Sequence, residues 1–289
     1  METSRSPSTA GRSIEAVVRN DISLDESYDA YPRIEEAFRE FLDESLHPRG
    51  PDALFDLIGS LGLPQEARAV DVGCGEGAQA IELATRFGFV VQGVDPVQRH
   101  IELCRQAIAK ADPAVAARGR FDSGSAEHLP LGDGSVDLIW CQEALMYAEL
   151  GPAFAEFRRV LRPEGHGLVY QVLTGPLMSD DEAAEFWNRG ARASSVRPAE
   201  IEEAIRASGL RLVHRTEFSS EWGERAEETE GAGTRRLLHA ARLLRDPERF
   251  AHRFGEAAYQ IMLGDCLWHV YRMIGKLTGC AFLFTSPPG

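Results

Sequence analysis

The chain has 289 residues, of which 44% are hydrophobic and 26% charged, a composition ordinary for a globular protein with one large core or two modest ones. Its formal net charge of −14 disfavours a nucleic-acid partner, and no apolar run approaches the ~20 residues that span a bilayer, so we expect no membrane partner. Five widely spaced cysteines without a CxxC pair argue against a disulfide framework and a zinc site, so a cytoplasmic protein without a metal is expected.

The first part of the chain predicts a tail followed by helices. Residues 1–25 are polar, lack the apolar segment of a secretory signal, and are predicted to be a flexible tail. Residues 26–64 are predicted to be helical, because Ile34, Phe38 and Leu42 follow helical spacing. These N-terminal helices are expected to cover a ligand site.

From residue 65 the pattern alternates between short apolar runs and amphipathic segments. Strands are predicted at 68–72, 90–95, within 118–126, 136–144 and 165–173, with helices between them, one of them over 153–163. A helix at 197–209 and strands at 210–218 and 279–287 follow. This alternation predicts an α/β fold, a mostly parallel sheet with helices on both faces.

The segment between the last two predicted strands is too long for a bare connection and is mostly helical in character. We therefore expect a helical cap over residues 221–277 that holds a substrate pocket. The sheet domain would then consist of residues 65–220 and 278–289.

The stretch "AVDVGCGEGAQA", residues 69–80, places Gly73, Gly75 and Gly77 directly after the first strand. Glycines in this turn let the backbone approach a ligand, and the start of the next helix offers unpaired N–H groups. The spacing is GxGxG rather than the dinucleotide GxGxxG, and Asp71 would repel a pyrophosphate but suit an ammonium group. Asp95, at the end of the second strand, can accept hydrogen bonds from both hydroxyls of a ribose.

Four stretches within residues 65–175 are "VDVGCGEG", "VVQGVDP", "GSAEHLPLGDGSVDLIWCQEAL" and "RRVLRPEGHGLVY". In this order they resemble the motifs of class I S-adenosylmethionine-dependent methyltransferases, of the small-molecule type that is similar to the enzymes of ubiquinone biosynthesis. The resemblance implies a Rossmann-like seven-stranded sheet and S-adenosyl-L-methionine as cofactor. It also implies that Asp71 and the glycine loop hold the amino-acid end of the cofactor, that Asp95 holds the ribose, and that the loop at 125–127 holds the adenine. The cofactor-binding residues predicted in this way are Asp71, Gly73, Cys74, Gly75, Gly77, Asp95, Pro96, Ser125, Ala126, Glu127, Gln142 and Tyr28.

Two positions depart from the family pattern. Ser125 stands where relatives usually carry aspartate, and its hydroxyl can still accept a hydrogen bond from the adenine amino group. Glu164 replaces the first glycine of the usual Pro-Gly-Gly turn, which is mostly structural. Cys74 has a second interpretation, as a small apolar filler of the loop.

Methyl transfer is an in-line displacement at a sulfonium, to which the protein contributes alignment and exclusion of water. A general base is needed only if the accepting atom must lose a proton. Residues predicted to act on the acceptor are Glu143 and Tyr147, which follow the fourth strand, and His269 and Tyr259 in the cap. Structural roles compete with this interpretation, because Glu143 can serve only the cofactor or the backbone and most of the 259–273 segment has core spacing.

The sequence thus predicts a methyltransferase that acts on an oxygen or nitrogen of a small-molecule acceptor, such as a secondary metabolite, as a monomer or homodimer. Methylation of a carbon acceptor such as an isoprenoid is the alternative. An NAD-dependent oxidoreductase is disfavoured by Asp71 and the GxGxG spacing. A non-catalytic binding module is disfavoured because the whole set of cofactor motifs is retained.

Overall fold

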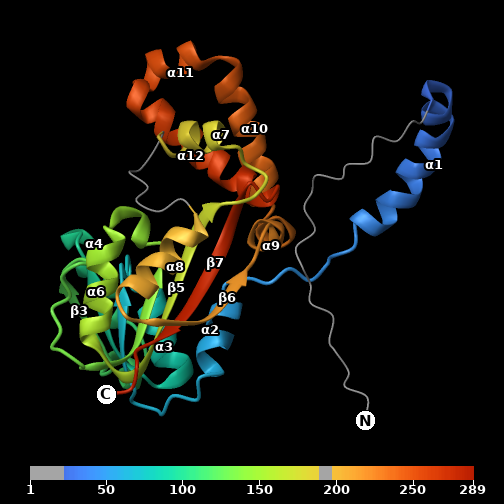
Figure 1. Cartoon of the computed structure of the whole chain (residues 1–289). Helices are drawn as coiled ribbons and strands as arrows, with labels where there is room; N and C mark the ends of the chain where they lie inside the picture. Colours follow the sequence, from blue (N-terminus) through green and yellow to red (C-terminus); the bar gives the residue numbers. More distant parts are fainter. Residues whose placement is uncertain (1–22, 189–196) are drawn as a thin grey trace, which may run out of the picture. The chain divides into compact units, whose positions relative to one another are not determined.

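The computed structural model describes residues 23–188 and 197–289, and the chain divides between residues 46 and 47 into two units (Figure 1). Most of the predicted N-terminal tail lies outside the described residues. The described part of the first unit holds one helix, α1 (Leu24–Leu42). The second unit, residues 47–289, contains the sheet and all elements described below.

Seven strands form one sheet in the order β3-β2-β1-β4-β5-β7-β6. The first five strands along the chain pair in parallel, whereas β7 is antiparallel to both β5 and β6. The seven-stranded, mostly parallel sheet predicted from the sequence is therefore confirmed. The strands are β1 (Arg68–Val72), β2 (Val90–Asp95), β3 (Gly119–Ser123), β4 (Val136–Gln142), β5 (Leu161–Thr174), β6 (Arg211–Glu217) and β7 (Leu277–Thr285).

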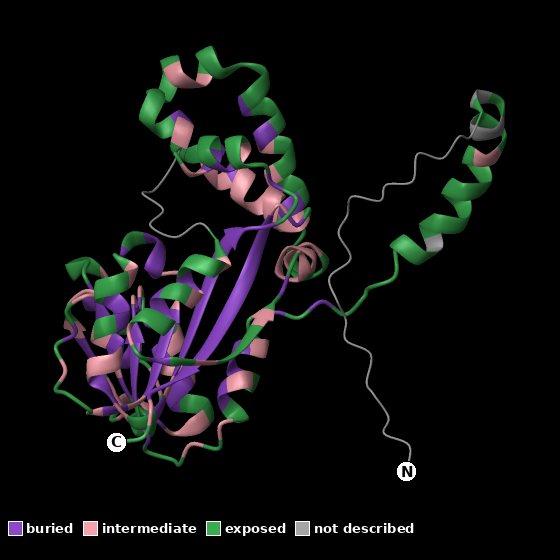
Figure 2. Cartoon of the chain, in the orientation of Figure 1, coloured by how far each residue is buried: buried purple, intermediate pink, exposed green. Residues whose placement is uncertain are grey.

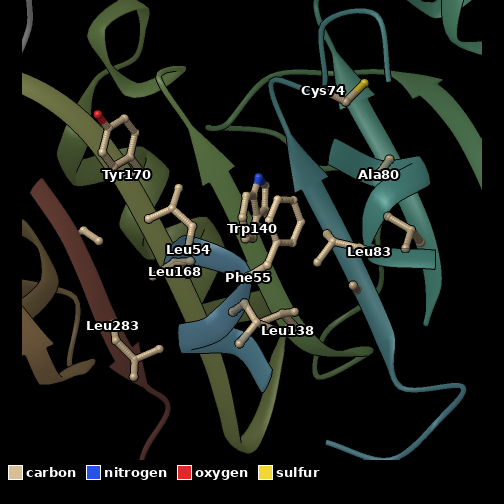
Figure 3. Close-up of a cluster of buried hydrophobic side chains, with 14 of the residues drawn as sticks. Leu54, Phe55, Cys74, Ala80, Leu83, Leu138, Trp140, Leu168, Tyr170 and Leu283 are labelled. Carbon is tan, nitrogen blue, oxygen red and sulfur yellow. The ribbon is translucent and has the colours of Figure 1, made fainter. Parts of the chain in front are cut away.

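Helices lie on both faces of the sheet (Figure 1). One core cluster joins α2, α3 and α4 to the sheet, and its centre is Trp140, whose ring stacks on Phe55 at 4.8 Å (Figure 3). The other core cluster joins α6 and α8 to the opposite face through Phe154, Phe157 and Phe284. These helices are α2 (Asp52–Gly59), α3 (Ala78–Phe87), α4 (Gln98–Ile108), the short α5 (Pro113–Ala116), α6 (Leu150–Val160) and α8 (Pro198–Ala207).

Two local expectations need correction. The helix expected over 153–163 ends at Val160, because Leu161 already pairs with Val136 at the start of β5. A helix that the sequence analysis missed, α7 (Asp180–Trp187), begins after Ser179, whose hydroxyl accepts the N–H of Glu182 at 3.3 Å. The run Ser-Asp-Asp-Glu was the available signal, since it resembles a capped helix start with acidic residues in its first turn.

Four helices lie between β6 and β7, as expected for a cap: α9 (Glu221–Glu230), α10 (Ala232–Arg245), α11 (Pro247–Phe254) and α12 (Glu256–Met273). They have a small core of their own, formed by Ala240, Leu243, Tyr259, Leu263 and Cys266. Much of the surface of α10 and α11 is exposed (Figure 2). Within the part of the chain that the structure describes, no helix has both the length and the apolarity needed to cross a bilayer.

Candidate active site

The glycine loop lies where the strand order of the sheet reverses. β1 has β2 on one side and β4 on the other, so the connections that leave these strands diverge and open a crevice at their carboxyl ends. Gly73, Gly75 and Gly77 all have positive φ, of 73°, 52° and 89°. The N–H groups of Gly73 and Cys74 both donate to Val94 O, at 2.8 and 3.1 Å, which ties the loop to the end of β2. A Cβ at Gly75 would meet no atom within 4 Å, so the crest of this loop is open to a ligand.

Asp71 is a buried carboxylate without a full set of partners. Its side chain is 2% exposed, and Oδ2 has no hydrogen-bond donor among residues 23–188 and 197–289. Burial raises the pKa of Asp71 to about 7, a hydrogen bond from the Ala80 backbone opposes this rise, and the nearby Asp95 adds to it. A cation brought to Oδ2 would satisfy the oxygen and stabilise the ionised form.

Asp95 ends β2 and organises the loops around it. Its Oδ2 accepts the Gly75 N–H at 3.0 Å, and its Oδ1 accepts the Val97 N–H at 2.9 Å. The Nδ1 of His100 lies 3.0 Å from the same Oδ1. A carboxylate has about four acceptor positions, so with these contacts Asp95 retains room on Oδ2 for one hydroxyl donor while it fixes the glycine loop.

The other residues predicted to bind the cofactor lie in different surroundings. Ser125 and His128 exchange backbone hydrogen bonds in a tight turn, and Ala126 is buried beneath it. Glu127 Oε1 accepts the Glu149 N–H at 2.8 Å, so this carboxylate braces the loop after β4. Cys74 is buried with its Sγ 3.9 Å from Cys104 Sγ, so its side chain packs against α4, as expected for a small apolar filler.

Three predicted cofactor residues have fewer structural constraints. Pro96 is exposed directly after Asp95, and Gln142 is half-buried at the last position of β4. Tyr28 belongs to α1, in the other unit of the chain. Their contribution to cofactor binding stays a prediction.

Glu143 follows β4 in a left-handed backbone conformation, with φ of 54°, which is unusual for a residue with a side chain. Its N–H donates to Tyr170 O at 2.8 Å, which fixes the turn to β5. Its carboxylate accepts no hydrogen bond from the described residues. Burial raises the pKa of Glu143, and the guanidinium of Arg272 offsets part of that rise. Strained backbone combined with a perturbed carboxyl is typical of functional positions.

A cavity of about 470 Å³ opens beside Glu143. We call it the strand-end cavity. Its walls come from three places, the turn after β4, helix α7 and helix α12. The Trp187 and Trp268 rings meet edge to face at 5.9 Å, and Trp187 Nε1 donates to Thr174 Oγ1 at 2.9 Å, which holds the aromatic wall in place. The lining residues are Glu143, Met146, Tyr147, Phe186, Trp187, Ile261, Gly264, Asp265 and Trp268.

The structure brings two of the four predicted acceptor-side residues together and separates the others. Glu143 and the exposed Tyr147 both line the strand-end cavity. His269 lies in a neighbouring cavity beside Trp222, and its Nε2 is 3.9 Å from Oδ1 of Asp265. Tyr259 is 7% exposed in the core of the cap and lines a different cavity, so it is not placed to act on a molecule beside Glu143.

Sequence reasoning missed Asp265 and Trp187, the former on α12 and the latter at the end of α7. Asp265 lines the strand-end cavity and forms an ion pair with Arg236 at 2.6 Å. The available signal for Asp265 was a lone carboxylate within an apolar helical stretch. Among the described residues, no group of three or more His, Cys, Asp or Glu side chains is arranged to hold a metal ion.

Comparison with known proteins identifies the family. A methyltransferase domain is matched over residues 70–169. The 27-O-demethylrifamycin SV methyltransferase of Amycolatopsis mediterranei is 30% identical over 192 residues, which cover 63% of this chain and 70% of that protein. The matched domain, residues 70–169, includes both the glycine loop and the strands β2, β3 and β4 that follow it.

Two solved structures share the fold. One is phosphoethanolamine N-methyltransferase 2 of Haemonchus contortus, solved in complex with phosphomonomethylethanolamine and S-adenosylhomocysteine. It superposes with a TM-score of 0.61 at 18% sequence identity, and the match covers 93% of this chain and 59% of that one. The other is geranyl diphosphate C-methyltransferase of Streptomyces coelicolor A3(2), solved in complex with Mg²⁺, geranyl-S-thiolodiphosphate and S-adenosylhomocysteine. It superposes with a TM-score of 0.59 at 15% sequence identity, and the match covers 81% of this chain and 75% of that one.

The reversal point of the sheet, the open glycine loop and the acidic residues that end β1 and β2 define an α/β enzyme with a nucleoside-containing cofactor. The chain belongs to the class I S-adenosylmethionine-dependent methyltransferases, and its cofactor is S-adenosyl-L-methionine. The orphaned Oδ2 of Asp71 and the open crest at Gly75 fit this cofactor, because one offers an acceptor to its ammonium group and the other admits it to the backbone.

Proposed function

We propose that the enzyme methylates an oxygen or nitrogen of a small-molecule acceptor bound in the strand-end cavity. The observation that carries this proposal is the position of Glu143. It lines the cavity, and the next residue, Ala144, lies directly against Gly73 of the glycine loop. One partly buried carboxylate therefore lies close to the cofactor loop and also lines a cavity large enough for a small molecule.

In this proposal the chain holds the cofactor at three points. Asp71 accepts from the ammonium group, Asp95 accepts from a ribose hydroxyl, and the turn at Ser125 meets the adenine edge. Asp95 serves a second purpose, since its hydrogen bond from Gly75 N–H fixes the loop before the cofactor arrives. Pre-organisation of this kind lowers the entropy cost of binding.

The cofactor supplies an electrophilic methyl group on a sulfonium, and the remaining work belongs to Glu143. A hydroxyl or protonated amine must lose a proton to become a good nucleophile, and a carboxylate with a raised pKa is suited to take it. The left-handed backbone at Glu143 directs the residue away from the path of β4, and the Tyr170 carbonyl holds that turn. Tyr147, at the exposed rim, is the second group of the chain that can contact the acceptor.

The chemistry of the strand-end cavity favours a neutral or cationic acceptor with apolar parts. Its lining contains the carboxylates of Glu143 and Asp265 and the rings of Phe186, Trp187 and Trp268, and no lysine or arginine among the described residues. The described lining offers no free cation to a diphosphate, because Arg236 is paired with Asp265 and Arg272 lies near Glu143, which argues against the isoprenoid diphosphate alternative. The O-methyltransferase similarity supports a hydroxyl acceptor of the secondary-metabolite type.

The test supplies S-adenosylmethionine carrying a deuterated methyl group to the purified protein and detects labelled products by mass spectrometry. The acceptor panel contains hydroxylated polyketides, aromatic amines and geranyl diphosphate with Mg²⁺. Label on oxygen or nitrogen, lost in Glu143→Gln and retained in Glu149→Gln, is the expected result. Label on a carbon of geranyl diphosphate alone would overturn the proposal in favour of the carbon-acceptor alternative.

A further inference from the structure

A second site lies at the outer end of the cap, on a different face of α12 from the strand-end cavity. Residues Ile261, Asp265 and Trp268 face the strand-end cavity, whereas Ala258 and Met262, one turn apart, face a separate cavity of about 620 Å³. Figure 1 shows α10, α11 and α12 together in this outer part of the molecule. We call this second hollow the cap-tip cavity, and its lining residues are His239, Arg242, Leu243, Phe250, Phe254, Ala258, Tyr259 and Met262.

The body of the cap-tip cavity is apolar, and part of that apolar surface is open to solvent. Phe254 is 61% exposed and Met262 is 38% exposed, although both are large hydrophobic side chains. A concave apolar surface with a few charged groups at its edge is the usual form of a small-molecule site. Its volume also falls within the range of roughly 300–1,000 Å³ that such sites occupy.

Arginines gather at one edge of the cap-tip cavity. An adjoining hollow of about 400 Å³ shares Arg242, Phe250 and Phe254 with it, so the two lie side by side. This hollow adds the side chains of Arg245, Arg249 and Arg253 and one carboxylate, that of Asp246. Four arginines thus converge from α10 and α11 on one end of an apolar cavity, in a chain whose net charge is −14.

These four guanidiniums form no ion pair with any carboxylate in residues 23–188 or 197–289. Other arginines of the chain are paired, such as Arg159 with Glu156 and Arg215 with Glu202. Asp246, which lines the same hollow, accepts the Arg249 N–H at 3.3 Å and so caps the start of α11. Four unpaired cations beside an apolar cavity complement a ligand that has an anion at one end and a hydrocarbon at the other.

We propose that the cap-tip cavity binds a single-chain amphiphile with an anionic head group, a long-chain carboxylate or alkyl phosphate. The hydrocarbon lies along Leu243, Phe254 and Met262, and the head group is held by Arg242 and Arg249. The cap-tip cavity and the strand-end cavity are lined by different faces of α12. Binding of an amphiphile is therefore separate from methyl transfer, and it does not rest on the acceptor proposed above.

The test uses dodecanoate and dodecyl phosphate as probes, below the concentration at which they form micelles, with binding measured by calorimetry on the full chain. Dodecyltrimethylammonium and octyl glucoside are the cationic and neutral control probes. Both anionic probes are expected to bind in preference to the controls. The double variant Arg242→Gln and Arg249→Gln should weaken them by about tenfold or more, through the loss of charge-assisted hydrogen bonds.

A cavity-filling variant distinguishes binding inside the cap-tip cavity from attraction of the probes to charges elsewhere on the surface. Ala258→Trp adds bulk at an exposed lining position and should weaken both anionic probes, while the matched surface variant Arg206→Gln on α8 should leave them unchanged. Binding of S-adenosylhomocysteine should stay the same in every variant, which shows that each is folded.

Three results would overturn the proposal. Equal binding of the cationic or neutral probe would remove the role of the arginines. Co-sedimentation with phosphatidylglycerol vesicles, without binding of the monomeric probes, would assign the surface to a membrane. A dimer in analytical ultracentrifugation that is lost in Phe254→Asp, again without probe binding, would assign it to a second copy of the chain.

Discussion

Gly73 and Ala144 lie in contact, so the loop after β1 and the turn after β4 share one boundary. A Cβ added to Gly73 would overlap the Ala144 Cβ, and the φ of 73° at this glycine also disfavours any side chain. This contact places the cofactor loop one residue away from Glu143. A shift of the glycine loop would therefore press on the turn that carries Glu143 into the lining of the strand-end cavity.

Asp95 is expected to be the main anchor of the cofactor ribose. Asp95→Asn should weaken binding of S-adenosylhomocysteine by about 1–3 kcal/mol, because a buried charged acceptor is lost. Calorimetry measures this change. The matched control is Asp137→Asn, at the start of β4. Like Asp95, Asp137 accepts a backbone N–H, that of Arg68 at 2.8 Å, and it also forms an ion pair with Arg162. Equal loss in both variants would show that the effect is structural.

Asp71 should make cofactor affinity depend on pH. Its pKa of about 7 means that the carboxyl is largely protonated in acid, and an ammonium group binds only the ionised form. Between pH 7 and the pKa of the ligand's own amino group, affinity for S-adenosylhomocysteine is therefore expected to be level, and below pH 7 it should fall by about tenfold for each pH unit. Asp71→Asn should bind more weakly and lose this dependence. A variant with the pH profile of the unmodified protein would contradict the role given to Asp71.

Glu143 is expected to act as the general base. Glu143→Gln should lower kcat by roughly 10²–10⁴-fold and leave cofactor affinity unchanged. Because burial raises the pKa of this carboxyl, activity should fall with decreasing pH at a point above the ordinary carboxyl range of about 4.3. The acidic limb should be absent from the residual activity of the variant. Glu149→Gln, a nearby exposed carboxylate, provides the control, and an identical limb in both variants would remove Glu143 from the mechanism.

Ile261 lies at the rim of the strand-end cavity and is 63% exposed, so enlarging it leaves the core intact. Ile261→Trp should narrow the cavity and raise KM for the acceptor on the order of tenfold, the effect typical of a changed apolar contact. Cofactor affinity should not change. Leu237→Trp, at an exposed position of α10, is the control, and an unaltered KM in Ile261→Trp would place the acceptor elsewhere.

Arg49 joins the segment before α2 to α9. Its Nε donates to Glu221 Oε2 at 2.7 Å, and its guanidinium lies 4.6 Å from the centre of the Phe218 ring. Both partners are partly exposed, so Arg49→Ala should lower the free energy of unfolding near neutral pH by only about 1 kcal/mol.

The Arg49 effect should also depend on pH. The hydrogen bonds from Arg49 lower the pKa of Glu221 below its unfolded value of about 4.3, so the stabilisation is complete above that value and is lost as pH falls through the lower folded pKa. Chemical denaturation at neutral and acid pH measures the difference between the two proteins. A difference that persists undiminished in acid would show that ring packing, not the ion pair, stabilises this junction.

The sheet and the cofactor loop could be predicted because local residues specify them. The strand at 68–72 is a short, mostly apolar run with Asp71 next to its end, and the glycines after it have positive φ, so the pattern and the backbone geometry agree. Strand and helix periods are local properties as well, which explains why seven strands could be read in order. The helix end at Val160 was misplaced because pairing of Leu161 with Val136 overrode a continuing helical pattern.

The strand-end cavity could not be predicted, since its walls come from segments far apart in the chain. Trp187 and Trp268 meet only after α7 and α12 pack together, and nothing in either local sequence records the other. Tyr259 and His269 lie on one helix, yet one turns into the cap core and the other toward Asp265. Spacing identified the helix, whereas the direction of each face depended on tertiary packing.

The most direct test of the account is a crystal structure of the protein with S-adenosylhomocysteine. We expect its amino group at Asp71, its ribose at Asp95, and its sulfur turned toward the strand-end cavity beside Glu143. A bound molecule whose sulfur is turned away from Glu143, or that leaves Asp71 and Asp95 without contact, would contradict the account.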